Sequence, residues 1–164
     1  MRLNFQDFTL VATEADDPEL KNLIRDEAAV KNLSETRQYS AAMPDRFVFR
    51  IEQEEKLIGE VRLQTIRWFN RKAEISIVFL PEYRGKGLGA KVLKEVIDYA
   101  FKSMNLHRLE AEIYEYNTAA QKLFERFGFQ KEGRLREARY TDGKYYDIIR
   151  YGLLRSKWEQ RRDS

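Results

Sequence analysis

Alternation of apolar and polar residues predicts several strands along the chain. Apolar residues recur at every second position over 47–51 and again in 57–63, and the polar segment "EQEEK" between them predicts a hairpin. The stretch "AEISIVFL", 73–80, becomes apolar on both faces toward its end, which is typical of a central strand. Residues 108–114, "RLEAEIY", alternate in the same way, and 8–13, "FTLVAT", predict a further short strand.

A second spacing, with apolar residues every three or four positions, predicts two helices in the second half of the chain. The segment from Gly87 to Ser103 carries such an apolar stripe. The segment "NTAAQKLFERFGF", 117–129, predicts a compact helix, which Asn117 can cap and which Gly128 can end in a left-handed conformation.

Helices are also expected near the N-terminus, and a hairpin is expected near the C-terminus. In "DDPELKNLIRDEAA", Asp17 is a helix cap and Pro18 suits the first helical position, and a second short helix is expected within 31–40. The dipeptide Asp142–Gly143 favours a primed turn between two strands. The order of elements predicts a mixed α/β (α+β) fold, in which helices flank a mixed sheet.

Composition narrows the classes of function without naming one. The 164 residues, with no Pro/Gly/Ser-rich linker, predict a single domain over 1–164. A net charge of +3 with interspersed signs gives no argument for nucleic acid. The chain has no cysteine and one histidine, His107, so we expect no metal site. No signal-peptide core and no run of 18 apolar residues are present, which predicts a cytoplasmic protein without a membrane partner.

The segment "FLPEYRGKGLGAKV", 79–92, carries the strongest chemical signal. Three glycines in five residues cost backbone entropy, so a conformation or a ligand should require them. The start of the following helix presents free N–H groups and a positive dipole end. Basic side chains surround the same point: Arg84, Lys86 and Lys91. This combination predicts a phosphate or pyrophosphate site, and the alternative is that the glycines only shape a tight connection.

Two other phosphate-binding motifs fit less well. The segment lacks the Gly-Lys-Ser/Thr ending of a nucleotide-triphosphate loop. Gly85, Gly87 and Ala90 do satisfy the G-x-G-x-x-A pattern of dinucleotide oxidoreductases, and Glu110 or Glu112 could bind the ribose. However, four residues separate the strand from the first glycine, and the pattern shows only one strand–helix–strand unit.

The segment resembles the GNAT superfamily of acyl-CoA-dependent N-acyltransferases, whose signature is Q/R-x-x-G-x-G/A. Residues 84–89 match it between a strand and a helix. Further blocks, "DYAFKSMNLHRLEAEIYEYN", "FERFGFQKEG" and "DGKYYDIIRYGLL", resemble the branch that acetylates ribosomal-protein N-termini and polyamines. The resemblance implies the GNAT fold: a mixed, mostly antiparallel sheet of about seven strands, about four helices and one parallel pair that splays apart.

The resemblance also implies a cofactor site for acetyl-CoA as co-substrate, with no metal. Its pyrophosphate would lie on the amides of residues 84–90, and its pantetheine would pair with the strand near residue 79. Asn117 matches an asparagine that borders the cofactor arm. The implied cofactor-binding residues are Val78, Phe79, Leu80, Arg84, Gly85, Lys86, Gly87, Leu88, Gly89, Ala90, Asn117 and Phe124.

The reaction needs a base for the amine and an acid for the leaving thiolate. Glu74 matches a carboxylate near the amine in the polyamine branch and is the candidate base, ahead of Glu35 and Glu137. The family's usual acid is a tyrosine at the position of Phe124, or a serine at that of Ala120. Three alternatives stay open: no acid, a hairpin tyrosine (Tyr140 or Tyr146), or acyl-CoA binding without catalysis.

The sequence thus predicts an N-acetyltransferase that moves an acetyl group from acetyl-CoA to a primary amine by direct attack. The alternatives are a catalytically silent acyl-CoA-binding module and, less well supported, a dinucleotide-binding oxidoreductase. The acceptor is a small molecule or a peptide, such as a polyamine or a protein N-terminus. A homodimer is left open, because Trp68 and Phe69 near a turn could line a substrate mouth or a dimer face, and ordinary packing explains them equally well.

Overall fold

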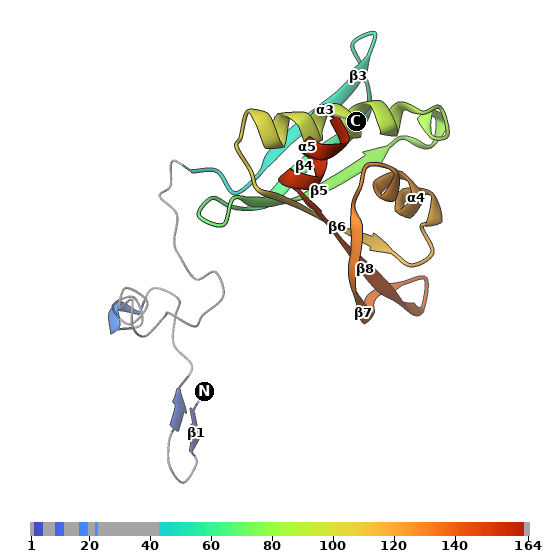
Figure 1. Ribbon diagram of the computed structural model, residues 1–164. Helices are drawn as coiled ribbons and strands as arrows, with labels where there is room; N and C mark the ends of the chain where they lie inside the picture. The colour runs from blue at the N-terminus through green and yellow to red at the C-terminus, as the bar shows by residue number, and fades with distance from the viewer. Residues whose placement is uncertain (1, 5–8, 12–16, 20–21, 23–42, 163–164) are drawn as a thin grey trace. The chain divides into compact units, whose positions relative to one another are not determined.

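The computed structural model describes residues 2–4, 9–11, 17–19, 22 and 43–162 (Figure 1). Its contacts divide the chain into two compact units, Met1–Ser40 and Ala41–Ser164. Each unit is described by itself, and the single domain over 1–164 stays a prediction.

The first unit contains a two-stranded antiparallel sheet and the start of a helix. Strand β1 (Arg2–Asn4) pairs with β2 (Thr9–Val11), which falls inside the predicted strand 8–13. Pro18, Glu19 and Asn22 are helical, and the Asp17 carboxylate accepts a hydrogen bond from the Glu19 amide at 2.9 Å. The helix therefore starts where the sequence predicted. The second expected helix, within 31–40, and Glu35 lie outside the described residues.

The second unit is organised around a six-stranded sheet in the order β3-β4-β5-β6-β8-β7. Neighbouring strands are antiparallel except β5 and β6, which are parallel. The strands are β3 (Phe47–Gln53), β4 (Lys56–Arg67), β5 (Lys72–Phe79), β6 (Arg108–Tyr114), β7 (Gln130–Thr141) and β8 (Lys144–Leu154). This mixed architecture confirms the predicted fold class.

Both predicted hairpins are present, and in each the two turn residues have the positive φ that a tight turn between paired strands requires. Asp142 and Gly143 both have positive φ, at 49° and 75°, as a primed turn requires. Glu54 and Glu55, at 50° and 64°, form the corresponding turn between β3 and β4. Gly128, at 92°, ends helix α4 in the left-handed conformation that the sequence predicted.

Helices cover one face of this sheet. A 3₁₀ turn (Pro81–Tyr83) leads to α3 (Leu88–Lys102), α4 (Thr118–Arg126) follows β6, and α5 (Arg155–Arg162) follows β8. Figure 1 shows α3 and α5 side by side over β4 and β5, and α4 beside β8. Buried residues of α3 and α4 join the odd-numbered residues of β5, β6 and β8 in one core. We call this the core face of the sheet.

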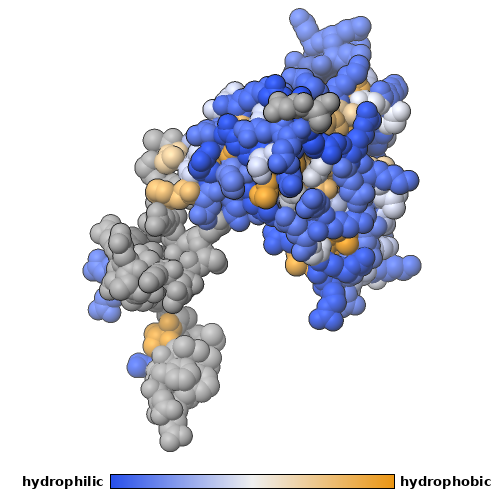
Figure 2. Space-filling view, viewed as in Figure 1, coloured by the Kyte–Doolittle hydropathy of each residue, from blue (hydrophilic) through white to orange (hydrophobic). Residues whose placement is uncertain are grey.

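The even-numbered residues of β5, β6 and β8 form the opposite face, which we call the polar face. It carries charged side chains, among them Glu74, Glu110 and Arg150, because side chains of a strand alternate between the two faces. In Figure 2 the visible surface of residues 43–162 is mostly hydrophilic, with isolated hydrophobic residues. The polar face is therefore the side of the sheet where ionisable chemistry can occur.

The structure differs from the sequence-based expectation at the C-terminus. The charged tail was not predicted to be helical, yet α5 buries the Trp158 ring to 8% exposure. The indole N–H donates to the Asp98 carboxylate of α3 at 2.9 Å, and the ring lies 5.2 Å from that of Phe101. One aromatic residue among charged ones gave no helical pattern, so only the tertiary contact identifies this helix. Among the described residues, the numbers of strands and helices also differ slightly from the predicted seven and four.

Candidate functional site

The parallel pair β5–β6 separates after three residue pairs. The last aligned pair is Glu74 with Glu110, although β5 continues to Phe79 and β6 to Tyr114. Beyond this point β5 still pairs with β4 and β6 still pairs with β8. Figure 1 shows the two strands diverging. Beyond Glu74 and Glu110, the neighbouring edges of β5 and β6 are thus no longer paired with each other. Their peptide groups can form hydrogen bonds with a ligand that enters the separation.

The glycine turn lies at the end of β5 and contains glycines of two kinds. Gly85 and Gly87 have φ of 72° and 76°, and a Cβ added to either would meet no atom within 4 Å. Glycine is therefore needed at these two positions for its backbone conformation and not for space, because residues with a side chain rarely adopt such a φ. Gly89 lies inside α3, where a Cβ would come within 3.3 Å of Leu123 on α4. Gly89 therefore allows these two helices to approach closely.

The start of α3 presents main-chain amides that the helix cannot use. Gly87 is the N-cap and makes no side-chain capping bond. The first intrahelical bond runs from the Lys91 amide to the Gly87 carbonyl at 3.5 Å. The amides of Leu88, Gly89 and Ala90 precede it, so they remain able to donate to a ligand. These amides and the positive end of the helix dipole suit a phosphate group.

The basic side chains of the turn are engaged within the turn. The Arg84 side chain donates from Nε to the Phe79 carbonyl at 3.0 Å, which ties the turn to the end of β5. The Lys86 ammonium lies 5.3 Å from the centre of the Tyr83 ring. An anion at the start of α3 would therefore meet main-chain amides first, with these cations close by in sequence.

The register of β4 and β5 decides which peptide groups of β5 face the separation. The Leu80 amide donates to the Ile58 carbonyl of β4 at 2.9 Å, so by alternation Val78 also bonds to β4. The peptide groups of Ile77 and Phe79 then point away from β4, toward the separation. Of the three predicted residues Val78, Phe79 and Leu80, only Phe79 thus directs its peptide group toward the separation. Ile77, which was not predicted, directs its peptide group the same way. The sequence could not show this, because it depends on strand register.

Asn117 and Phe124 lie at the two ends of one side of α4. The Asn117 side-chain oxygen accepts from the Ala120 amide at 3.1 Å, which caps α4 as predicted and leaves the side-chain nitrogen as its donor toward a ligand. Phe124 is 3% exposed, and its ring lies 4.9 Å from that of Phe129. Phe124 is therefore mainly a core residue.

Glu74 lies on the polar face at the point where the strands separate. Its carboxylate accepts a hydrogen bond from the Gln64 side chain of β4 at 3.0 Å, and it is half-buried. Its neighbour across the parallel pair is Glu110. A partly buried carboxylate at the edge of the separation is well placed to receive a proton from a group that enters from the polar face.

Glu110 belongs to a network of ion pairs and differs from Glu74 in this respect. Burial opposes its ionisation, but a 2.8 Å hydrogen bond from Arg108 and the charge of Lys72 together hold the pKa of Glu110 below its ordinary value. Arg108 also donates to Glu132 of β7, which lowers the pKa of Glu132. These two carboxylates thus stabilise the sheet through ion pairs, whereas the Glu74 carboxylate accepts its hydrogen bond from the neutral Gln64 side chain.

The structure does not bring Tyr140 and Tyr146 to Glu74. Tyr146 contacts Tyr116, at 4.9 Å between ring centres, and Tyr116 lies in the turn that follows Tyr114, the last residue of β6. Tyr114 is four residues beyond Glu110, which at about 3.3 Å per residue is roughly 13 Å. Tyr140 pairs with Tyr145, so it lies on the opposite face of the hairpin from Tyr146. The three candidate catalytic residues therefore do not form one site.

The β7–β8 hairpin holds two groups of residues whose arrangement the sequence did not show. Asp147 accepts from the Glu137 amide at 2.8 Å and from Arg134 at 2.6 Å, which holds the irregular part of β7 against β8. Asp147 thus fixes the hairpin. Tyr146 of the same hairpin gathers with Tyr114 and Tyr116 on the polar face. Only the register of the strands reveals this clustering.

No helix in the described part of the chain is both long and apolar enough to cross a membrane. Among the same residues, no group of three or more histidine or acidic side chains is arranged to hold a metal ion.

Comparisons with known proteins agree with this geometry. Residues 4–149 match the family described as "Acetyltransferase (GNAT) domain". Spermidine N(1)-acetyltransferase of Vibrio cholerae serotype O1 is 36% identical over 116 residues, which is 71% of this chain and 66% of that protein. The putative ribosomal N-acetyltransferase YdaF of Bacillus subtilis is 34% identical over 103 residues, which is 63% of this chain and 56% of that protein.

A solved structure gives the same result for the fold. The dodecameric spermidine N-acetyltransferase from Vibrio cholerae, in an intermediate state, superimposes with a TM-score of 0.69 at 30% identity, covering 87% of this chain and 77% of that one. The matched segments span about two thirds or less of the two curated relatives' own lengths. The family match covers most of the chain, and the strand separation and the glycine turn fall inside it. The chain therefore belongs to the GNAT acetyltransferase family.

Proposed function

We propose that this protein is an acetyl-CoA-dependent N-acetyltransferase that acts on a primary amine by direct attack. The single observation that carries the proposal is the separation of β5 and β6 directly before a turn whose helix presents three main-chain amides. A thioester in the separation would be open to both faces of the sheet. The one parallel pair in the six-stranded sheet is also too few for a dinucleotide-binding fold.

The donor would bind from the core-face side of the separation. Its diphosphate would accept hydrogen bonds from amides within residues 84–90, with Lys86 and Lys91 supplying positive charge. Its pantetheine would run along β5 as an added strand and pair with the peptide groups of Ile77 and Phe79. The Asn117 side chain would donate to the same arm. Arg84 would share the Phe79 carbonyl, because a carbonyl oxygen can accept two hydrogen bonds.

The acceptor would enter from the polar face, where Glu74 lies. An alkyl ammonium has a pKa of about 10.4, so at pH 7 only about one molecule in a few thousand is the nucleophilic free amine. Glu74 would take the proton, directly or through water, which is worth about 10²–10⁴ in rate. The Ile77 amide is the first amide beyond the last parallel pair to point into the separation, and it would stabilise the oxyanion.

The leaving thiolate would depart without a protein acid. Phe124 has no hydroxyl, Tyr146 contacts Tyr116 in the turn beyond β6, and Tyr140 lies on the opposite face of the hairpin from Tyr146. A thiol has a pKa of about 8.5, so the thiolate is a tolerable leaving group and can take a proton from water. Among the alternatives that the sequence left open, the positions of the two tyrosines favour this one.

The test is release of free thiol from acetyl-CoA in the presence of a panel of amines, with cofactor affinity measured in parallel. The panel includes spermidine and short peptides, because the two curated relatives are named for a polyamine and for ribosomal N-acetylation. We expect amine-dependent thiol release. Tight acetyl-CoA binding without release on any amine would instead support a silent binding module, which the phenyl ring of Phe124 specifically favours.

We also propose that the protein self-associates. The support is a structural neighbour that is dodecameric. Light scattering of the purified chain gives the molar mass, and a value near 19.6 kDa would contradict self-association.

A further inference from the structure

A patch of aromatic and apolar side chains continues along the polar face beyond Glu74 and Glu110. Its residues lie on β6, in the turn that follows β6, and on the neighbouring strands β8 and β7. We call it the tyrosine patch, and its residues are Tyr114, Tyr116, Leu135, Arg139, Tyr146 and Ile148. None of these contributes to the donor site described above.

The contacts within the patch are specific. The Tyr116 ring lies 5.4 Å from Tyr114 and 4.9 Å from Tyr146. The Arg139 guanidinium lies 5.3 Å from the centre of the Tyr114 ring. Tyr116 and Leu135 nevertheless remain 51% and 39% exposed. The rings are thus held in place by one another while part of their surface stays accessible.

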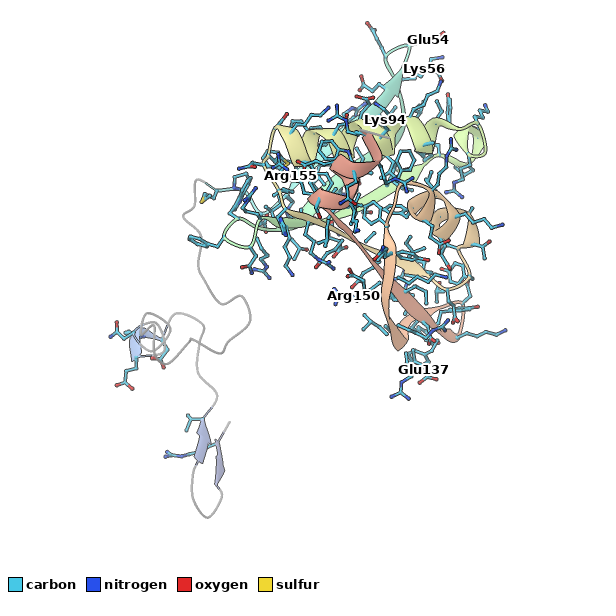
Figure 3. The ribbon with its side chains drawn as sticks, viewed as in Figure 1. Glu54, Lys56, Lys94, Glu137, Arg150 and Arg155 are labelled. Carbon is cyan, nitrogen blue, oxygen red and sulfur yellow. The ribbon has the colours of Figure 1, made fainter. Side chains whose placement is uncertain are left out.

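The patch lies on the same face as Glu74 and at a defined distance from it. Glu74 aligns with Glu110, and Tyr114 is four residues farther along β6, which is roughly 13 Å. Between them, Glu112 pairs with Arg150 of β8 at 3.2 Å. Figure 3 shows Arg150 on the side of β8 away from α4, as this face requires. The polar face thus runs from a candidate base, past one ion pair, to the tyrosine patch.

We propose that the tyrosine patch binds the acceptor at a point about 13 Å from its reacting amine, and that it selects an uncharged apolar group there. This inference rests on the proposed function. About four residues of extended peptide span 13 Å, so the occupant is an apolar side chain near the fifth residue of a peptide whose N-terminal amine reacts.

Arg139 is the reason that the patch selects against a second positive charge. Its guanidinium already occupies the face of Tyr114, which is where an acceptor cation would gain a cation–π contact. A second cation would also be repelled by Arg139 at short range. An apolar side chain does not compete with Arg139 for the face of Tyr114 and is not repelled by its charge, and it removes exposed ring surface from water. A polyamine is therefore the disfavoured acceptor at this position.

The experiment compares kcat/KM for matched acceptors by the thiol-release assay. Two hexapeptides differ only in Leu or Lys at the fifth residue, a dipeptide amide is too short to reach the patch, and spermidine supplies a distal cation. We expect the Leu peptide to exceed the Lys peptide by about tenfold, which is the effect of burying one aliphatic side chain. The dipeptide amide measures the reaction without the patch.

Variants assign the preference to particular residues. Tyr146→Ala is expected to reduce the Leu preference several-fold and to leave the dipeptide amide unchanged. Arg139→Gln is expected to raise kcat/KM for the Lys peptide while that for the Leu peptide stays within about twofold. The matched control is Tyr145→Ala, since Tyr145 is the next residue on β8, is 63% exposed and faces away from the patch.

The outcomes separate this inference from the proposed function. Equal rates for the two hexapeptides, unaffected by Tyr146→Ala, would overturn the inference while leaving the enzyme in place. Spermidine as the best acceptor, with a loss on Tyr146→Ala, would overturn it in favour of a cation subsite. No thiol release with any amine, including the dipeptide amide, would instead contradict the proposed function itself.

Discussion

The two sides of the β5–β6 separation are built in different ways. On the donor side, most of the proposed contacts are main-chain groups: the amides at the start of α3 and the peptide groups of Ile77 and Phe79. On the acceptor side they are side chains from separate strands, such as Glu74 on β5 and Tyr146 on β8. Main-chain groups can bind the same donor whatever the side chains are, whereas the side chains that contact the acceptor can differ with the acceptor. The donor therefore follows from the order of residues in one short segment, whereas the acceptor depends on side chains from several strands.

Removing the conformational freedom of Gly87 should affect the donor side most strongly. In Gly87→Val, a branched side chain would be placed at a φ of 76°, which costs on the order of 1–3 kcal/mol and displaces the amides of the turn. We expect acetyl-CoA affinity to fall by roughly a hundredfold while circular dichroism shows a folded protein, with affinity measured by calorimetry.

The matched control for that change is Gly143→Val. Gly143 has nearly the same φ, 75°, and a Cβ there also meets no atom within 4 Å, but it lies in the β7–β8 turn. The control should bind acetyl-CoA as the unmodified chain does. Equal affinities for Gly87→Val and Gly143→Val would mean that the donor side does not depend on this turn.

Removing the charge of Glu74 should affect the acceptor side alone. In Glu74→Gln the side chain keeps its size but loses its ability to take a proton, so we expect kcat to fall by about a hundredfold with acetyl-CoA affinity unchanged. The control is Glu60→Gln, because Glu60 lies on β4 and pairs with Arg62 at 2.5 Å. A kcat within twofold of the unmodified protein would remove Glu74 as the base.

A smaller effect is expected from pH, through the ion pairs beside Glu74. The pKa values of Glu110 and Glu132 lie below the ordinary 4.5. For Glu110, burial raises the pKa, but Arg108 and Lys72 together lower it by more; for Glu132, the hydrogen bond from Arg108 outweighs burial. A lowered folded-state pKa stabilises the fold above the ordinary value, and this stability is lost as the pH falls through the folded-state value.

Thermal unfolding between pH 6 and pH 3 checks this expectation. The melting temperature should fall as the pH drops below about 4.5, and Arg108→Gln should show a shallower fall because the lowered pKa values return toward ordinary ones. The same slope in both proteins would mean that the Arg108 pairs do not couple to folding.

Local chemistry was enough to predict much of the fold. The primed turn at Asp142–Gly143, the cap at Asn117 and the stop at Gly128 each depend on one residue's conformational preference, and all three are present. The glycine turn was recognised for a similar reason, because glycines at positive φ and helix-terminal amides follow from the order of residues alone.

The remainder depended on contacts between distant segments. Helix α5 is held by Trp158 against α3, and the use of the Leu80 amide by β4 follows from strand register. The tyrosine patch joins β6, β7 and β8 across two pairings, so Tyr146 was identified as a candidate by residue type and not by location. Side chains on one face of a sheet become neighbours only when register is known.

A crystal structure of the protein with coenzyme A tests the central claim most directly. The account predicts diphosphate oxygens about 2.7–3.2 Å from amide nitrogens within residues 84–90, and pantetheine between β5 and β6. A diphosphate held elsewhere, with the amides of Leu88, Gly89 and Ala90 facing solvent, would contradict it.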